Sequence, residues 1–258
     1  MKRSIQRALG LICAAGILLC AATAMAKDDV ATVVAVRGKT IIDRNKLVLE
    51  AKVKDPVLLV DTISTGDTSR AKLLFVDDSV LTMGEKSKVV IKEFVYSKEK
   101  GGKSIFNLID GKMKSVVGKA GFEVHTPTAV AAARGTVIFF EVGPRDGKLC
   151  TTILCTEGEV AASSPDPNVK DTLTLTSDTI VTICEGMPFP ATTLRAQNSE
   201  KNKMIGDTSL VGYEISMLRP SQVEAGLRRF DLALPLAPQI PNQQPVNRTP
   251  VTIDLIFK

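Results

Sequence analysis

The feature that most constrains this fold is a long succession of short apolar or β-branched segments, each ended by a turn-forming residue. Between Asp29 and Gly186 most of these segments are four to nine residues long, and Gly or Asp follows most of them. Runs of this length that end at turn-forming residues are typical of β-strands joined by tight turns. No amphipathic helix interrupts the series, which excludes a parallel α/β fold with crossover helices. The sequence therefore predicts an all-β fold of many short strands, as an antiparallel sandwich, a barrel or a β-solenoid.

The same pattern gives the expected strands and core. We expect strands over residues 30–36, 39–42, 57–63, 71–76, 80–83, 88–96, 104–109, 113–117, 121–124, 135–142, 149–156, 171–176 and 179–184. The residues expected to be buried between them are Val33, Leu59, Leu74, Phe75, Ile91, Phe106, Phe122, Ile138 and Phe140.

The character of the chain changes after Pro190, where we expect a short helical and Pro-rich C-terminal extension. We expect a polar loop over 195–206, helices over 208–219 and 221–234, and an extended Pro-rich linker over 235–250. Residues 251–257 alternate apolar and polar side chains. They are either a frayed tail or a strand that docks on a sheet edge, of this chain or of a partner.

The N-terminus has the three parts of a secretory signal peptide. Lys2, Arg3 and Arg7 precede an uncharged apolar run, and Ala24-Met25-Ala26 supplies small residues for cleavage after Ala26. Two other interpretations remain. Cys20 could be a lipoprotein cysteine, although the large Leu19 precedes it, and the apolar run could be retained as a membrane anchor. We expect a cleaved signal over 1–26 and a periplasmic or secreted protein, with membrane contact only if the segment stays uncleaved.

Charge and composition exclude several classes of function. Loss of the signal peptide lowers the formal net charge from +5 to +2, and the chain has no Trp and two Tyr. Such a chain lacks the basic surface and aromatic platforms of nucleic-acid binding proteins. His125 is the single histidine, so a site of several histidines is impossible. We expect His125 to be a half-buried strand residue rather than a catalytic base, because no nucleophile motif lies near it.

Three cysteines remain after export, which suggests one disulfide and one thiol. Cys150 and Cys155 are five residues apart and would point to opposite faces of a strand, so a bridge between them would be strained. We favour Cys155 with Cys184, with three buried thiols as the alternative. No metal site is expected, because no histidine lies near and no CxxC spacing occurs.

Five fragments between about residues 55 and 162 together resemble the FecR domain, the extracytoplasmic β domain named after the ferric-dicitrate regulator. They are Asp61-Thr62-Ile63-Ser64-Thr65-Gly66 with Ser69-Arg70-Ala71, Phe75-Val76-Asp77-Asp78-Ser79 with Leu81-Thr82-Met83, Asn107 to Lys112, Phe122 to Ala129 running into Arg134-Gly135-Thr136, and Glu157-Gly158-Glu159-Val160. The motif residues taken from this resemblance are Asp61, Gly66, Asp77, Gly111, Thr126, Pro127, Arg134, Gly135, Thr136, Glu157 and Gly158. The resemblance implies a FecR-like β domain over 27–190, followed by a loop and helical segment over 191–234 and the tail over 235–258.

Two positions depart from the family pattern. Val60 stands where the family usually has Gly, and we expect a strand to accommodate it. Asp78 replaces the turn glycine, and Asp tolerates a positive φ there. For Arg134 we expect a structural role, tying down turn carbonyls or a carboxylate such as Asp110 or Glu157, with a ligand contact as the alternative.

Full FecR-type regulators resemble sigma-factor controllers, with a cytoplasmic helical arm, a membrane span and the β domain outside. Only Met1 to Arg7 precede the apolar run, so we expect no sigma-factor arm and do not carry over anti-sigma activity. We expect a non-catalytic, exported binding or scaffold module without cofactor, accessory to envelope signalling and bound to an envelope protein or glycan. The alternative is a periplasmic hydrolase that cleaves envelope glycans with carboxylates, although adjacent Asp77 and Asp78 would face opposite ways on a strand.

Overall fold

The computed structural model describes residues 29–97, 101–118 and 120–210. The chain divides into two compact units, 1–217 and 218–258, and all described residues lie in the first. The expected signal peptide, the two expected helices apart from residues 208–210, the Pro-rich linker and the terminal strand therefore lie outside the described residues.

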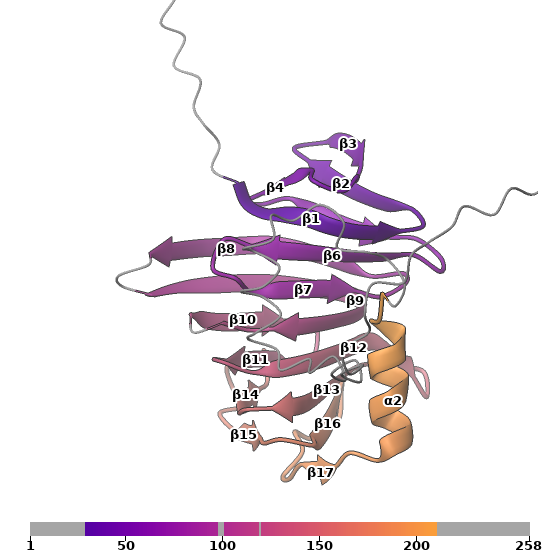
Figure 1. The fold of residues 1–258 in the computed structure, drawn as a ribbon. Helices are drawn as coiled ribbons and strands as arrows, with labels where there is room; N and C mark the ends of the chain where they lie inside the picture. The colour runs from indigo at the N-terminus through magenta and orange to yellow at the C-terminus, as the bar shows by residue number, and fades with distance from the viewer. Residues whose placement is uncertain (1–28, 98–100, 119, 211–258) are drawn as a thin grey trace, which may run out of the picture. The chain divides into compact units, whose positions relative to one another are not determined.

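The described residues of this unit form seventeen strands, arranged in two layers that share one long strand. In Figure 1 the strands follow one another from indigo to orange in nearly chain order. Layer A contains, from edge to edge, β4 (Pro56–Leu58), β1 (Asp29–Arg37), β6 (Arg70–Phe75), β7 (Val80–Met83), the second half of β9 (Gly101–Val116), β12 (Val137–Arg145), β13 (Lys148–Glu157), β16 (Thr179–Cys184) and β17 (Leu194–Arg195). Layer B contains β3 (Leu47–Glu50), β2 (Thr40–Arg44), β5 (Thr62–Thr65), β8 (Lys88–Ser97), the first half of β9, β10 (Gly121–His125), β11 (Val130–Ala133), β14 (Val160–Ser163) and β15 (Thr172–Leu175).

Neighbouring strands are antiparallel throughout both layers, except that β9 and β10 run parallel. The sheet does not close on itself. The prediction of an all-β fold is therefore confirmed, and the described strands form open layers rather than a closed barrel.

The strand β9 joins the two layers. The sequence predicts two strands here, separated at Asp110-Gly111, whereas the structure has one strand of 16 residues that changes layer at this point. Gly111 has φ +87°, and a Cβ atom there would lie 2.4 Å from the Cα of Ser87. Only glycine fits so close an approach between backbones, so Gly111 allows one strand to serve both layers.

The core lies between the layers and draws residues from each. The rings of Phe75 in layer A and Phe106 in layer B have centroids 5.1 Å apart, and Phe106 lies 5.0 Å from Phe122. Seven of the nine expected core residues are buried: Val33, Phe75, Ile91, Phe106, Phe122, Ile138 and Phe140. Two expectations were wrong. Leu59 is 37% exposed in a turn, and the half-buried Leu74 lies on the outer face of layer A because its neighbours Leu73 and Phe75 face the core.

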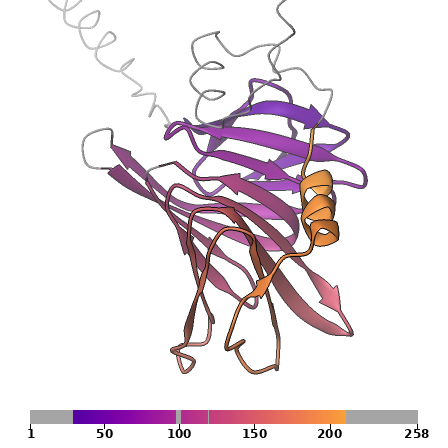
Figure 2. The same ribbon diagram turned by 60° about the horizontal axis from the view of Figure 1, so that its bottom comes forward.

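A helix covers part of the outer face of layer A. The expected polar loop over 195–206 was wrong, because helix α2 spans Asn198–Asp207 and lies beside β9 and β12 (Figures 1 and 2). Its one buried residue, Met204, packs with Phe139, Leu154 and Ile180 of the sheet. The helix has one buried side chain instead of an apolar stripe, which explains why the sequence pattern missed it.

The position before Asp61 differs from our expectation. Val60 does not lie in a strand but in the turn between β4 and β5, with φ +69° and 61% exposure. A left-handed conformation costs an L-residue about 1–2 kcal/mol and is least tolerated by β-branched side chains. The Gly that the family usually has here would avoid this cost.

We expect Val60→Gly to raise the free energy of unfolding by up to ~1 kcal/mol, since relief of strain exceeds the backbone entropy that glycine loses on folding. Urea unfolding would measure it. Val76→Gly is the matched control, because Val76 is also an exposed turn valine (54%) but has no positive φ. Equal destabilisation by the two variants would contradict this account.

Candidate functional site

The motif residues lie mainly in turns and at strand ends of both layers. Gly66 donates its N–H to the carbonyl of Lys39 at 3.0 Å, and Gly135 donates to the carbonyl of Gly118 at 2.8 Å. Arg134 is exposed in the turn between β11 and β12, and Glu157 is the exposed last residue of β13. The structure thus distributes the motif along the domain, as expected for residues that shape turns.

Asp61 is the most buried acidic residue of the motif. Its side chain is 1% exposed, and it accepts a fork of hydrogen bonds from Arg44 Nε at 2.9 Å and Nη2 at 2.7 Å. It also accepts the backbone N–H of Leu58 at 2.8 Å, while Arg44 donates to the carbonyl of Pro56 at 2.9 Å. These bonds join β2 to the turn between β4 and β5.

Asp77 and Asp78 form the turn between β6 and β7. The Asp77 carboxylate accepts hydrogen bonds from the N–H and the hydroxyl of Ser79, both at 3.0 Å. Burial raises the pKa of Asp77, and the two bonds from Ser79 oppose this rise. Asp78 has φ +64°, which confirms that Asp takes the place of the usual turn glycine.

Two distant motifs meet at Thr136 and Gly158. Thr136 is 2% exposed, and Gly158 has φ +82°. A Cβ atom on Gly158 would lie 2.6 Å from the methyl group of Thr136 and 3.0 Å from the carbonyl of Gly135. The Arg-Gly-Thr and Glu-Gly motifs therefore pack directly against each other, and only a glycine at position 158 allows this approach.

A buried chain of threonine hydroxyls was not anticipated from the sequence. Thr126 and Thr128 lie 2.8 Å and 2.7 Å from the hydroxyl of Thr151, and Thr128 donates to the carbonyl of Ile183 at 2.9 Å. Thr126 also accepts the N–H of Ala129 at 2.9 Å. These bonds join the Thr-Pro turn at Pro127 to β13 and β16, so Thr126 has a structural role.

The predicted disulfide was wrong. The structure joins Cys150 to Cys184 and leaves Cys155 as a buried thiol. Cys150 lies directly opposite Cys184 on neighbouring strands, on the outer face of layer A. Cys155 is on the other face, in the core, where burial raises the pKa of its thiol to about 11. Its thiol is therefore protonated at neutral pH and a poor nucleophile.

The single histidine lies on the opposite side of the domain. His125 is half-buried on β10, as expected, and its Nε2 contacts the carboxylate of Glu123, which also pairs with Lys103 at 3.5 Å. The hydrogen bond from His125 lowers the pKa of Glu123. Both side chains lie on the outer face of layer B, away from the cavity described next.

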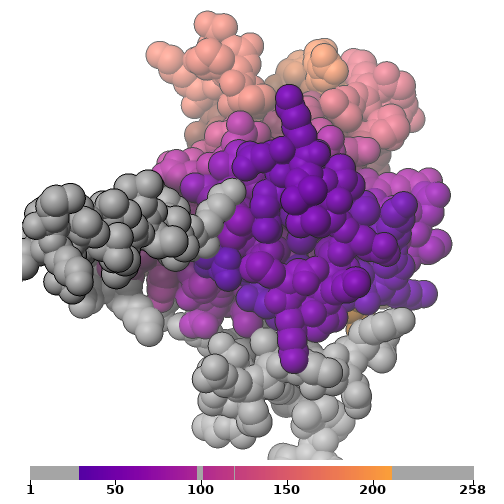
Figure 3. Space-filling model, turned by 90° about the horizontal axis from the view of Figure 1, so that it is seen from above, coloured from indigo at the N-terminus to yellow at the C-terminus, as the bar shows by residue number. Residues whose placement is uncertain are grey.

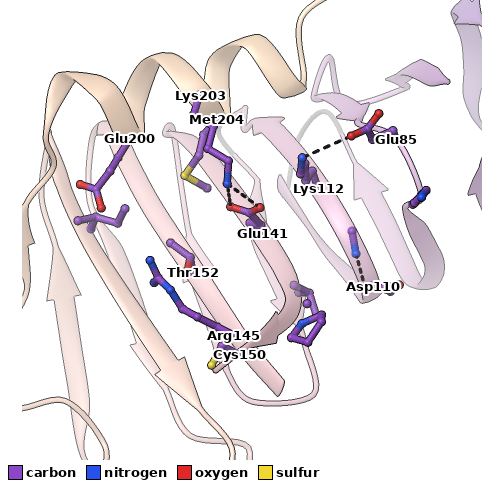
Figure 4. Close-up of a pocket in the computed structure, with 16 residues that line it drawn as sticks. Glu85, Asp110, Lys112, Glu141, Arg145, Cys150, Thr152, Glu200, Lys203 and Met204 are labelled. Carbon is purple, nitrogen blue, oxygen red and sulfur yellow. Dashed lines mark hydrogen bonds and ion pairs between the residues drawn. The ribbon is translucent and has the colours of Figure 1, made fainter. Parts of the chain in front are cut away.

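A cavity of about 510 Å³ opens on the outer face of layer A beside α2 (Figure 4). Its floor is formed by β9, β12 and β13, one wall by α2 and the other by the turn before β8. The residues that line it are Glu85, Lys86, Asp110, Gly111, Lys112, Glu141, Val142, Gly143, Pro144, Arg145, Cys150, Thr152, Ile180, Glu200, Lys203 and Met204. Of the motif residues only Gly111 is among them, so sequence reasoning missed this cavity.

Charges of both signs line the cavity, and most are paired. Lys203 donates to both oxygens of Glu141 at 3.0 and 3.1 Å. Arg145 is exposed and donates to the hydroxyl of Thr182 at 3.2 Å, and Thr182 lies 3.0 Å from Thr152. Within residues 29–97, 101–118 and 120–210, Arg145 has no carboxylate partner. An arginine beside two hydroxyl groups is suited to binding carboxylates or other polar oxygen groups.

The wall formed by α2 is held at its C-terminal end. Arg70 donates to the carbonyls of Asp207 at 2.9 Å and Gly206 at 3.3 Å, and Lys112 pairs with the Asp207 carboxylate at 2.8 Å. Burial lowers the pKa of Lys112, but the bond to Asp207 and the negative charges of Asp207, Glu141 and Glu85 together outweigh it and leave the pKa raised. Basic groups bound to the last carbonyls of a helix favour its dipole, so these residues fix α2 against the sheet.

Metal-binding clusters and membrane-spanning helices are both lacking in the part of the chain that the structure describes. No group of three or more His, Cys, Asp or Glu side chains there could hold a metal ion. No helix in those residues is long and apolar enough to cross a bilayer.

No curated protein matches this chain. Two crystal structures of a protein from Parabacteroides distasonis, described as a proposed anti-sigma factor, are similar to part of it. The structure at 1.65 Å resolution has 11% identity and a TM-score of 0.44, covering 55% of this chain and 62% of its own. The one at 2.50 Å has 12% identity and a TM-score of 0.45, covering 56% and 63%. This chain therefore spans less than two thirds of that protein.

The profile of the FecR protein family matches residues 61–161. The match begins at the buried Asp61 and ends in β14, and so includes every motif residue quoted above. Strands β1 to β4 precede the match but belong to the same core, because β1 pairs with β6. Residues 61–161 of this chain are a FecR domain.

Proposed function

We propose that this chain is an exported, non-catalytic binding or scaffold module of the bacterial cell envelope, accessory to envelope signalling. The FecR domain supports the signalling part, and the signal-like N-terminus supports export. The observation that carries the binding part is the cavity of about 510 Å³ between layer A and α2.

The lining of this cavity is better suited to binding than to catalysis. Glu141 is engaged by Lys203, and Glu200 accepts the N–H of Gln197 at 3.1 Å as part of a helix cap. Both carboxylates are thus held by contacts within the domain, whereas Arg145 and Thr152 remain at the surface to contact a partner. Because α2 is one wall, an envelope protein or glycan bound here would contact the helix from which the C-terminal segment continues.

Site-specific photo-crosslinking in cells tests the proposal. A photoreactive amino acid at Thr152, on the cavity floor, should capture a defined envelope component, and Arg145→Ala should reduce that capture several-fold. Asn107 is the matched control position, because it is a half-buried residue on the outer face of layer B. Equal capture from both positions, or capture unaffected by Arg145→Ala, would contradict a binding site in this cavity.

The hydrolase alternative requires a separate measurement. The purified chain should leave peptidoglycan and simple glycans intact over long incubations. The result that would favour a hydrolase is turnover that is abolished by Glu141→Gln. The same turnover should be unchanged by Asp166→Asn, a substitution on an exposed loop.

A further inference from the structure

The outermost strand of layer B has an unpaired edge with exposed apolar side chains. In the described part of the chain β3 pairs only with β2, and Leu47 and Val48 are 58% and 64% exposed. Figure 3 looks onto this end of the domain, where the indigo and purple N-terminal strands reach the surface. Unpaired edges of this kind are ready to pair with another strand.

The turn geometry determines which backbone groups point outward from this edge. Asn45 and Lys46 both have positive φ, 51° and 70°, as in the two-residue turns of tight hairpins. In such a hairpin the flanking residues Arg44 and Leu47 exchange hydrogen bonds, and the pattern repeats every second residue. The bond of 2.9 Å from the N–H of Ala51 to the carbonyl of Thr40 follows the same pattern.

The N–H and C=O groups of Val48 and Glu50 therefore point away from β2, toward the open edge. An antiparallel partner strand whose twofold axis passes through Val48 would pair the backbone groups of Val48 with their own equivalents and bring Glu50 opposite the partner's Lys46. Val48 would bond to the partner's Val48 in both directions.

The side chains are complementary in that register. Leu47 lies opposite the partner's Leu49, and the twofold symmetry repeats this apolar pair on the other side of the axis. Lys46 lies beside the partner's Glu50, and both side chains are exposed and have no ion pair within the described residues. Opposite charges on facing positions of neighbouring strands stabilise the pairing, and like charges oppose it.

We propose that two copies of this chain associate through β3, in an antiparallel, twofold-symmetric pair centred on Val48. Symmetric interfaces in which a surface meets itself are the usual form of homodimers. Val60, exposed beside the Asp61 that binds Arg44 of β2, adds apolar surface at the same end of the domain. The proposal is independent of the cavity beside α2.

Sedimentation velocity of the exported, full chain over a wide concentration range tests it, with two charge reversals. Lys46→Glu places two glutamates side by side, and Glu50→Lys places two lysines side by side. Each variant alone should dimerise about tenfold more weakly than the wild type, since two pairs change from attractive to repulsive. An equimolar mixture of the two variants restores opposite charges at both positions and should associate as the wild type does.

Rescue by mixing cannot arise from an effect within one chain. A wild type that stays monomeric at every concentration, or single variants that dimerise unchanged, would overturn the proposal. Deletion of residues 249–258 tests the other occupant, the terminal strand expected from the sequence. Dimerisation should persist after this deletion. If the deletion abolishes dimerisation, or if a dimer forms only after the deletion, then the tail and not a second β3 occupies the edge.

Discussion

Replacing Phe106 by alanine is expected to lower the free energy of unfolding by about 3–5 kcal/mol, the usual cost of truncating a fully buried phenylalanine. Phe106 is 1% exposed and contacts Phe75 of the facing layer and Phe122 of the adjacent strand. Its removal leaves a cavity between two layers that β9 holds together, so collapse around it is limited. Chemical unfolding followed by circular dichroism would measure the loss.

Phe189→Ala is the control for this prediction. Phe189 is half-buried at the border of the same core, so its truncation should cost less than about 2 kcal/mol. A similar loss for the two variants would mean that Phe106 is not at the centre of the packing between the layers.

Arg44→Ala is expected to cost about 3–5 kcal/mol, because it leaves the carboxylate of Asp61 buried without its partner. Asp61 retains only the N–H of Leu58 after this change. Arg44→Lys should recover part of the loss, since an ammonium group keeps the charge but not the fork. Thermal unfolding of the three proteins at neutral pH would establish the order.

A double-mutant cycle separates the free-energy cost of the unpaired, buried Asp61 carboxylate from the cost of the packing lost with Arg44. Adding Asp61→Asn to Arg44→Ala removes the buried charge, so the double variant should be more stable than the sum of the single effects predicts. Strict additivity would show that the two side chains do not act as a pair, contrary to their bonds of 2.7 to 3.2 Å.

The fold class was predictable because strand length, turn residues and the absence of helical periodicity are local properties. The positive φ of Asp78 was predictable for the same reason. The prediction for Val60 was wrong, because its left-handed conformation depends on where Asp61 must be placed to bind Arg44, 17 residues earlier.

The disulfide illustrates the limit of local reasoning. Strand parity correctly separates Cys150 from Cys155, but parity alone does not say which of them shares a face with Cys184. That choice depends on the register of β13 against β16, which places Cys150 opposite Cys184 and Cys155 opposite Thr179.

The sequence by itself determined a β-rich domain, its turns and its family, since each depends on residues close together in the chain. The tertiary structure alone decided that β9 serves both layers, that α2 covers part of layer A, and that a cavity forms beside it. Lys203 and Glu141 are 62 residues apart, and Arg70 reaches a helix end 137 residues away. Such contacts form only when the strands have paired in one register, because residues so far apart in the chain are brought together by the assembled sheet and not by any local segment.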